Sequence, residues 1–482
     1  MAVLFTLSNR QAVSFMNKRA LFSDESSEYR IPQEPDINHP VTIRFRAAAE
    51  DVDYVYLIHN GIRLEMEKTF SYGLFDYYSL IIPLREDRYY YYFEIIKGDE
   101  VCYYSKLGVT DQVHLERQFW ILPGMKVPDW AKGAVFYQIF TDRFCNGDAE
   151  NDVVDDEYAY IEGHHVKKIK DWYQPPSAMD VRNFYGGDLQ GVMDKLDYLQ
   201  QLGVEAIYLN PIFVSPSNHK YDTQDYDNVD PHLGRIVEDC DGVLPEDDQV
   251  RDNRHSAKYI RRVTNQKNLE ASNELFRQLA QEIHSRGMYL ILDGVFNHCG
   301  SFNKWMDRER IYEGQEGYAP GAYVSADSPY RSFFKFYKDQ WPYNDFYEGW
   351  WNHDTLPKLN YEESPELKEY IMGIARKWVS APYHVDGWRL DVAADLGRSE
   401  EYNHRFWKEF RSHVKQANSD ALIMAEHYGN AASWLMGDEW DTVMNYDAFM
   451  EPVSWFLTGM EKHSDRFDEG LLNNADAFFQ AM

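Results

Sequence analysis

Cysteine is scarce in this sequence: there are four in 482 residues, and no two of them form a CxxC pair. They are Cys102, Cys145, Cys240 and Cys299. A disulfide framework or a thiolate zinc site needs cysteines at paired spacings. The pattern therefore predicts neither, and a chain of this length is expected to form two or three units with large hydrophobic cores.

Long hydrophobic runs are also missing. No apolar stretch approaches the ~20 residues that a membrane helix requires. The first residues, MAVLFTLSNRQAVSF, lack both a basic start and the small-residue cleavage site of a secretory signal. We therefore expect a cytoplasmic protein that does not insert into a membrane.

Basic residues are few, with 49 Lys and Arg against 79 Asp and Glu, for a formal charge of −30. A surface this acidic repels phosphate backbones and anionic lipids, so neither nucleic acid nor a membrane is a predicted partner. Aromatic residues are abundant at 16%, including 36 Tyr. Most will fill a core, but Tyr and Trp also suit stacking on sugar rings, because each joins a flat apolar face to a polar edge.

Residues 1–124 have the pattern of an antiparallel β-sandwich. Short β-branched and aromatic segments alternate with polar or glycine breaks, a spacing typical of such sandwiches. These segments are residues 41–47, 52–58, 77–84 and 89–96. Pro123, Gly124 and Pro128 then interrupt the pattern, which places a domain boundary after residue 124.

From residue 125 onward, predicted strands alternate with amphipathic helices. Repeated βα units build a parallel sheet and usually close into a (β/α)8 TIM barrel, so the predicted fold class is α/β. The six predicted strands lie at residues 134–140, 205–213, 288–296, within 384–396, and at 421–428 and 441–447. The first half of the barrel spans residues 125–298 and contains a charged insertion at 234–266. Residues 299–363 form a predicted subdomain over the barrel mouth, and 364–482 continue the barrel, giving six of eight βα units.

Three acidic residues fall at the C-terminal ends of consecutive predicted strands: Asp293, Asp391 and Glu426. Active sites of TIM barrels lie at that face, so these carboxylates are expected to converge in space. Arg389 stands two positions before Asp391, which puts both side chains on one face of a strand. A lone Arg–Asp pair is usually structural, but three carboxylates at one rim indicate an enzyme.

Several stretches resemble the α-amylase family of glycoside hydrolases, in particular neopullulanases, cyclomaltodextrinases, maltogenic amylases and amylopullulanases. They are VFYQIFTDRFCNGD (135–148), FYGGDLQGVMDKLDYLQQLG (184–203), IYLNPIFVSPSNHKYDT (207–223), DGVFNH (293–298), LPKLN (356–360) and GWRLDVA (387–393). The resemblance covers residues 133 to about 450. The N-terminal β domain is similar in architecture to the starch-binding-type sandwich that precedes the barrel in these enzymes.

This resemblance implies that Asp391 is the nucleophile and that Glu426 is the general acid/base. A retaining glycosidase holds such a pair ~5–5.5 Å apart, with one group ionised and the other protonated. We expect Arg389 to keep Asp391 ionised, and the charge of Asp391 to raise the pKa of Glu426. The implied substrate-binding residues are Arg389, His298, Tyr221, Asp293 and Asn297, with Asp293 as a scaffold.

The resemblance also implies a metal site. The loop NGDAEND gathers oxygen donors, and YGGD matches the remaining ligands of a family calcium site. The six positions are Asn146, Asp148, Asn151, Asp152, Gly186 and Asp188. Calcium favours shells of about six to eight oxygen donors. We therefore predict a structural Ca²⁺, with an Asx-rich turn that holds no metal as the alternative.

The family's third essential carboxylate, in a His-Asp pair after strand seven, has no counterpart before Met482. We therefore expect a fragment with little turnover of its own. The leading function is a retaining hydrolase of α-1,4 bonds, with α-1,6 bonds left open, in maltooligosaccharides, cyclodextrins, pullulan or starch. A transglycosylase stays open, as does a non-catalytic α-glucan-binding protein if the chain ends there. A homodimer through the N-terminal domain is expected by analogy.

Overall fold

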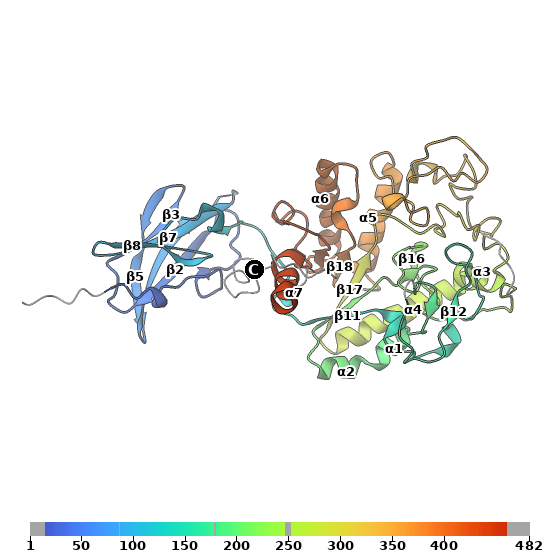
Figure 1. Cartoon of the computed structure of the whole chain (residues 1–482), viewed down its shortest axis with the longest axis horizontal. Coiled ribbons are helices and arrows are strands. Elements are labelled where there is room, and N and C mark those ends of the chain that lie inside the picture. Colours follow the sequence, from blue (N-terminus) through green and yellow to red (C-terminus); the bar gives the residue numbers. More distant parts are fainter. Residues whose placement is uncertain (1–14, 86, 178–179, 246–251, 460–482) are drawn as a thin grey trace, which may run out of the picture. The chain divides into compact units, whose positions relative to one another are not determined.

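The computed structural model describes residues 15–85, 87–177, 180–245 and 252–459. The contacts divide the chain into an N-terminal unit that extends to Lys126 and a second unit, Val127–Pro452 (Figure 1). Within the described ranges, no helix has both the length and the apolarity needed to cross a membrane.

The N-terminal unit is a sandwich of two antiparallel sheets (Figure 1). One sheet has the order β1 (Arg30–Ile31), β2 (Pro40–Ala48), β6 (Phe75–Pro83), β5 (Glu67–Tyr72). The other has β4 (Ile62–Glu65), β3 (Tyr54–His59), β7 (Tyr89–Lys97), β8 (Glu100–Ser105), β9 (Gly108–Thr110), with β10 (Phe119–Ile121) paired to β7. Alternate side chains of β2 are fully buried, and they form one core with β3 and β7. The predicted sandwich is confirmed, and its four predicted strands are β2, β3, β6 and β7.

The second unit is built on a parallel sheet whose strands pair in chain order. Its strands are β11 (Phe136–Ile139), β14 (Ala206–Leu209), β17 (Tyr289–Gly294), β18 (Gly387–Leu390), β19 (Leu422–Ala425) and β20 (Thr442–Val443). This is the strand arrangement of a TIM barrel. The described part of the chain thus contains the six predicted barrel strands, each shorter than its apolar segment suggested.

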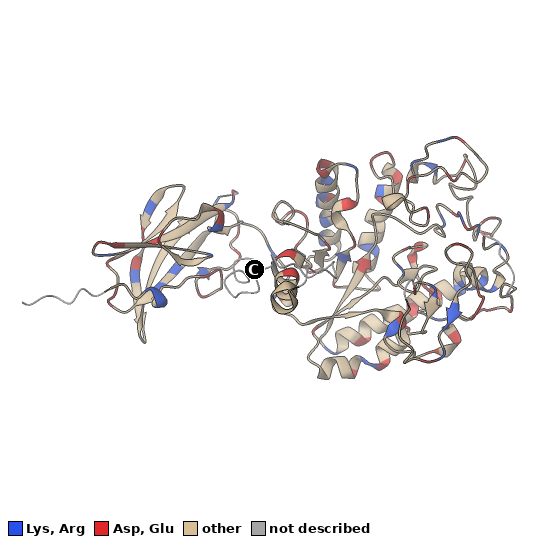
Figure 2. Ribbon diagram, viewed as in Figure 1, with Lys and Arg blue, Asp and Glu red and all other residues tan. Residues whose placement is uncertain are grey.

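Helices pack on this sheet through their apolar sides, which form one core with the strands. They are α1 (Leu189–Asp194), α2 (Leu196–Gln201), α4 (Gln266–Ser285), α5 (Pro365–Val379) and α6 (Glu400–Ala417). The other α-helices of the described residues are α3 (Ala257–Thr264), whose buried side chains belong to a separate core, and α7 (Glu451–Thr458). Ser364 caps α5, because its side chain accepts a hydrogen bond from the Leu367 N–H. Charges of both signs are interspersed along α6 (Figure 2).

Helix α4 begins earlier than predicted. Its apolar spacing indicated a start near Ser272, but Asn265 caps the helix by accepting hydrogen bonds from the N–H groups of Lys267 and Asn268. The extra turn is polar yet buried, because the Asn268 side chain donates to the Glu238 carbonyl. Hydrophobic periodicity misses a helical turn that is held by polar contacts.

Short β-strand pairings connect the loops that follow the barrel strands. β12 (Lys167–Lys168) pairs with β13 (Asn183–Phe184), and β15 (Phe213–Val214) with β16 (Asp225–Val229). A single bridge between His298 and Lys358 ties the 299–363 excursion to the segment that follows β17. This bridge places the excursion at the C-terminal edge of the barrel sheet.

Candidate active site

The predicted catalytic residues converge at the C-terminal edge of the sheet. Asp293 on β17 lies in register with Arg389 on β18. Asp391 and Glu426 each follow the last residue of β18 and β19, which are neighbouring parallel strands. Parallel pairing therefore brings together side chains that are far apart in the sequence.

One guanidinium group contacts all three carboxylates. Arg389 Nη1 donates to Asp391 Oδ1 at 2.9 Å and to both carboxylate oxygens of Asp293 at 3.0 and 3.1 Å. Arg389 Nη2 contacts Glu426 Oε2 at 2.9 Å. Asp391 and Glu426 are only 9% and 8% exposed. A single positive charge therefore serves three buried acidic groups, and full ionisation of all three is costly.

The pKa shifts of Asp391 and Glu426 run in directions opposite to the predicted ones. Burial, followed by the charges of Asp293 and Glu426, raises the pKa of Asp391 well above its usual value. Burial opposes the shift at Glu426, but Arg389 and the Val392 N–H lower the pKa of Glu426. The Arg389 guanidinium, which is expected to keep Asp391 ionised, is shared with Asp293 and Glu426, and burial opposes its effect on the pKa of Asp391.

A strained turn helps to hold Glu426. Val392 has φ +35° and ψ 49°, a left-handed conformation that costs a β-branched residue energy. In this turn the Val392 N–H donates to Glu426 Oε2 at 3.0 Å. Tyr428 and Tyr446 each donate a hydroxyl to Glu426 Oε1 at 3.2 Å. Neither Tyr was predicted, although both lie in the strand segments that were identified.

Asp293, for which a scaffold role is predicted, accepts several hydrogen bonds at the site. Its Oδ2 accepts hydrogen bonds from Tyr221 Oη at 3.0 Å and from Tyr208 Oη. Together with Arg389, these contacts leave Asp293 occupied as an acceptor. Tyr208 was not predicted as a site residue, though it lies within the IYLNPIF segment on β14.

His298 is held by a relay of hydrogen bonds. The Lys358 ammonium donates to Asn297 Oδ1, Asn297 Nδ2 donates to His298 Nδ1 at 3.0 Å, and His298 Nε2 donates to the Tyr221 carbonyl at 3.2 Å. Burial lowers the pKa of His298 to about 3, so the ring is neutral. Trp350 stacks on it at 4.7 Å between ring centroids. Lys358 was overlooked as a site residue, although LPKLN was identified as a family motif.

A cavity of about 700 Å³ opens beside Glu426, lined in part by His427 and Tyr428. Tyr428 donates a hydrogen bond to Glu426. Other lining residues are Trp350, Trp351, Arg398 and Trp434. Aromatic faces together with a few polar groups are what a sugar-binding cleft requires.

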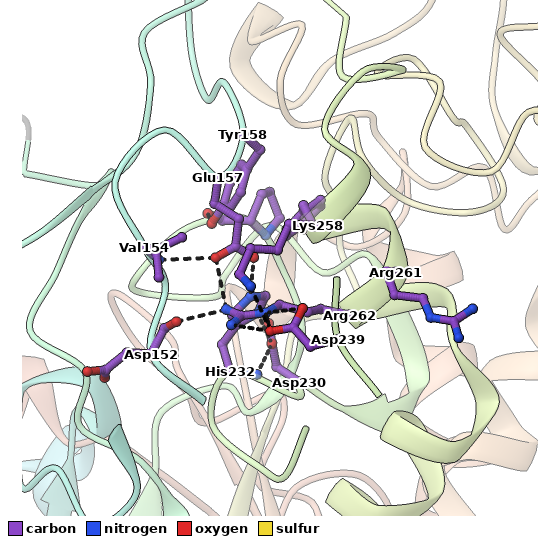
Figure 3. A network of polar contacts seen from close by, with 12 residues as sticks. Asp152, Val154, Glu157, Tyr158, Asp230, His232, Asp239, Lys258, Arg261 and Arg262 are labelled. Carbon is purple, nitrogen blue, oxygen red and sulfur yellow. Dashed lines mark hydrogen bonds and ion pairs between the residues drawn. The ribbon is translucent and has the colours of Figure 1, made fainter. Parts of the chain in front are cut away.

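Behind Tyr221 lies a buried network of ions. Lys220 Nζ contacts Asp230 Oδ2 at 2.7 Å, and His232 contacts Asp230 Oδ1 at 2.8 Å and Glu157 Oε1 at 2.8 Å through its two ring nitrogens. Figure 3 shows Arg262 completing the network between Glu157 and Asp239. A ring with a carboxylate at each nitrogen donates from both, so His232 is an imidazolium.

This arrangement predicts a pH-dependent stability. Burial opposes the shift, but Glu157 and Asp230 raise the pKa of His232 above its unfolded value. The contribution of His232 is therefore complete below pH ~6.5 and is lost as pH rises through the raised pKa. We expect His232→Asn to lower the free energy of unfolding by about 3–5 kcal/mol at pH 6, and by less at pH 8.5. Urea unfolding of both proteins across this range measures the difference, and a pH-independent difference contradicts the assignment.

The six predicted calcium ligands also come together, with nitrogen donors among them. The Asp188 carboxylate accepts hydrogen bonds from the backbone N–H groups of Gly147, Asp148 and Gly191. The Asn151 side chain contacts Asp188 Oδ2 at 3.5 Å. These contacts leave Asp188 little capacity to bind a metal ion.

The remaining positions surround Lys168. Asp152 Oδ1 accepts from Asn146 Nδ2 at 2.9 Å, and Lys168 Nζ contacts Asp152 Oδ2 at 2.6 Å. In this arrangement the six residues do not form a calcium shell, because N–H groups already donate hydrogen bonds to their carboxylate oxygens. One oxygen, Oδ1 of the buried Asn151, has no hydrogen-bond partner. The calcium ion itself stays a prediction.

Most glycoside hydrolases use a pair of Asp or Glu side chains that flank the bond they cleave. The Asp–Glu pair at the C-terminal edge of this parallel barrel sheet is an arrangement of that kind. The chain matches the family model described as "Alpha amylase, catalytic domain" over residues 138–249 and 268–466. It matches "Alpha amylase, N-terminal ig-like domain" over residues 16–122. The chain belongs to the alpha-amylase family and is an α-glucan glycoside hydrolase.

Individual relatives agree with this assignment. A cyclomaltodextrinase of Thermoanaerobacter pseudethanolicus is 31% identical, with 97% of this chain and 72% of that protein aligned. Neopullulanase 2 of Thermoactinomyces vulgaris is 33% identical, with coverages of 94% and 67%. Among solved structures, the type III pullulan hydrolase from Thermococcus kodakarensis is similar with a TM-score of 0.59 and 25% identity, with 95% of this chain and 68% of that chain covered. The predicted family resemblance is confirmed.

Proposed function

We propose that this protein is a retaining hydrolase of α-1,4-glucosidic bonds, with Asp391 as the nucleophile and Glu426 as the general acid/base. Its substrates are maltooligosaccharides, cyclodextrins, pullulan or starch, and α-1,6 bonds are a second candidate linkage. The observation that carries the proposal is the contact of Arg389 with both carboxylates at adjacent strand ends. Retention needs two carboxyl groups ~5–5.5 Å apart, one on each side of the scissile bond, and contact with one shared guanidinium supports such a pair.

In the first step Asp391 attacks the anomeric carbon while Glu426 protonates the departing glycosidic oxygen. In the second step Glu426 takes a proton from water, which then releases the sugar from Asp391. The Asp391 side chain also hydrogen-bonds Glu426, so the two carboxyl groups titrate as a pair. The reaction requires the charge of this pair on Asp391 and the proton on Glu426.

His298, Tyr221 and Arg389 are proposed to contact the sugar that is being cleaved. The neutral His298 ring is held at one angle by Trp350 and Asn297, so its position is set before substrate binds. Tyr221 is tied to Asp293, which supports its assignment as a platform beneath the sugar. Asn297 contacts His298 and Lys358, which supports a positioning role for it.

The test is a product assay of the full-length gene product on maltotriose, β-cyclodextrin and pullulan. NMR of the first product is expected to show the α-anomer, because two successive inversions retain configuration. Oligosaccharides longer than the substrate would favour the transglycosylase alternative. Binding of β-cyclodextrin with no product from any substrate would favour the binding-protein alternative, and a β-anomer would exclude the retaining mechanism.

Two further predictions remain part of the proposal. A cytoplasmic location is proposed from the similarity to an intracellular maltogenic amylase of Bacillus subtilis. A homodimer through the N-terminal sandwich is proposed by analogy, and sedimentation velocity of the protein measures it. A monomer at all concentrations would exclude this dimer.

A further inference from the structure

The backbone places Lys168 beside the YGGD turn. Lys168 lies on β12 in parallel register with Phe184 on β13. The Ile169 N–H donates to the Phe184 carbonyl at 2.7 Å, and the Lys168 N–H donates to Asp155 Oδ1 at 2.9 Å. Its position is therefore set by strand pairing as well as by its side chain.

The ammonium group sits where the loop's oxygens converge. Lys168 Nζ contacts Asp152 Oδ2 at 2.6 Å and donates to the Tyr185 carbonyl at 2.9 Å. A Cβ added to Gly186 would lie 2.0 Å from Lys168 Nζ and 1.9 Å from Asp152 Oδ1. Gly186 also has φ +82°, so the turn needs glycine both for its conformation and for the close approach of this ion pair.

The neighbouring carboxylates already have other partners. Asp142 accepts from the N–H groups of Tyr185 and Gly186 and pairs with Arg143 Nε at 2.8 Å. Asp188 caps helix α1 through the Gly191 N–H. Asp152 has Lys168 as its positively charged partner on Oδ2. Its other oxygen, Oδ1, accepts a hydrogen bond from the uncharged amide of Asn146.

We infer that the Lys168 ammonium occupies the cation position of the NGDAEND and YGGD loops, so that the chain supplies its own cation and the folded loop does not need calcium. A calcium ion requires about six to eight oxygens with free lone pairs, whereas an ammonium needs only a few acceptors. The two oxygens that contact Lys168 are enough for an ammonium group. They are too few for a calcium ion, because N–H groups already donate to the oxygens of Asp188. The inference does not depend on the proposed catalytic roles.

The experiment compares thermal unfolding of the EDTA-treated protein with and without millimolar CaCl₂, together with calorimetric titration of CaCl₂. The wild type is expected to unfold at the same temperature in both conditions and to release no binding heat. Lys168→Ala is expected to unfold a few degrees lower in EDTA, since it leaves Asp152 without its countercharge. Recovery of that loss by CaCl₂ would further support a shared cation position.

Two control variants separate this role from general effects. Lys167→Ala removes the adjacent exposed lysine of β12 and is expected to match the wild type. Lys168→Arg keeps the charge and is expected to remain insensitive to calcium. The inference is overturned if EDTA destabilises the wild type and CaCl₂ restores it, as an ion bound through Asn151 Oδ1 would require. It is also overturned if Lys168→Ala is as stable as the wild type. If Lys168→Ala does not fold, the CaCl₂ titration of the wild type still tests the inference.

Discussion

Replacing Asp391 by Asn is expected to reduce kcat on maltotriose by about 10⁴-fold or more, since loss of the nucleophile in a covalent mechanism has effects of this order. The amide cannot form the glycosyl-enzyme, while it can still accept the hydrogen bond from Arg389 Nη1. KM is expected to change little, because the lost interaction belongs to the transition state. Initial rates and the melting temperature of the variant, measured side by side, distinguish lost chemistry from lost folding.

A trapping experiment tests directly whether Asp391 forms the covalent sugar adduct. A 5-fluoro-α-glucosyl fluoride should leave a sugar adduct on the wild type, located at Asp391 by peptide mass spectrometry. Asp386→Asn serves as the matched control, because Asp386 lies at the opposite end of the same strand and pairs with His284. It should retain kcat within a few-fold, since that end of a barrel serves stability. An adduct on another residue would remove Asp391 from the role of nucleophile.

Replacing Glu426 by Gln is expected to reduce kcat on maltotriose by about 10²–10⁴-fold, the contribution of a general acid. The loss should be much smaller on α-glucosyl fluoride, because fluoride departs without a proton. Gln has the shape of Glu and keeps one acceptor oxygen for the two tyrosine hydroxyls on Oε1, while its NH2 group replaces the oxygen that accepts from the Val392 N–H. The ratio of the two rate losses is therefore the diagnostic quantity.

The pH profile provides a second readout for Glu426. The wild type should show a bell-shaped dependence of kcat/KM, because one group of the pair must be ionised and the other protonated. The alkaline limb reports loss of the acid proton, so it should be absent from the Gln variant assayed on α-glucosyl fluoride. Equal losses on both substrates, or an unchanged alkaline limb, would show that Glu426 is not the acid.

Strand and helix patterns accounted for much of the fold. The alternation in VTIRFRA identified β2, and the βα alternation identified the six barrel strands, because both patterns reflect burial on one side of a local element. The start of α4 was missed, since its first turn is held by Asn265 and Asn268 through polar contacts. Hydrophobic spacing carries no signal for such contacts.

The sequence identified which residues lie at the candidate site, but not their hydrogen-bond partners. Motif matches and strand ends were enough to bring Asp391 and Glu426 together. They did not identify Tyr208 or Lys358 as partners of Asp293 and Asn297, because those contacts join different strands and loops. The motif around Lys358 was visible, but its hydrogen bond was not.

The sequence by itself determined the order of the elements, the family and the residues that meet at the barrel rim, because these follow from local periodicity and motif spacing. Only the tertiary structure decided that Arg389 is shared among three carboxylates, and that Lys168 reaches the loop where a metal was predicted. Charge states and cation sites depend on burial and on distances between groups that lie far apart along the chain. No pattern of neighbouring residues encodes those distances.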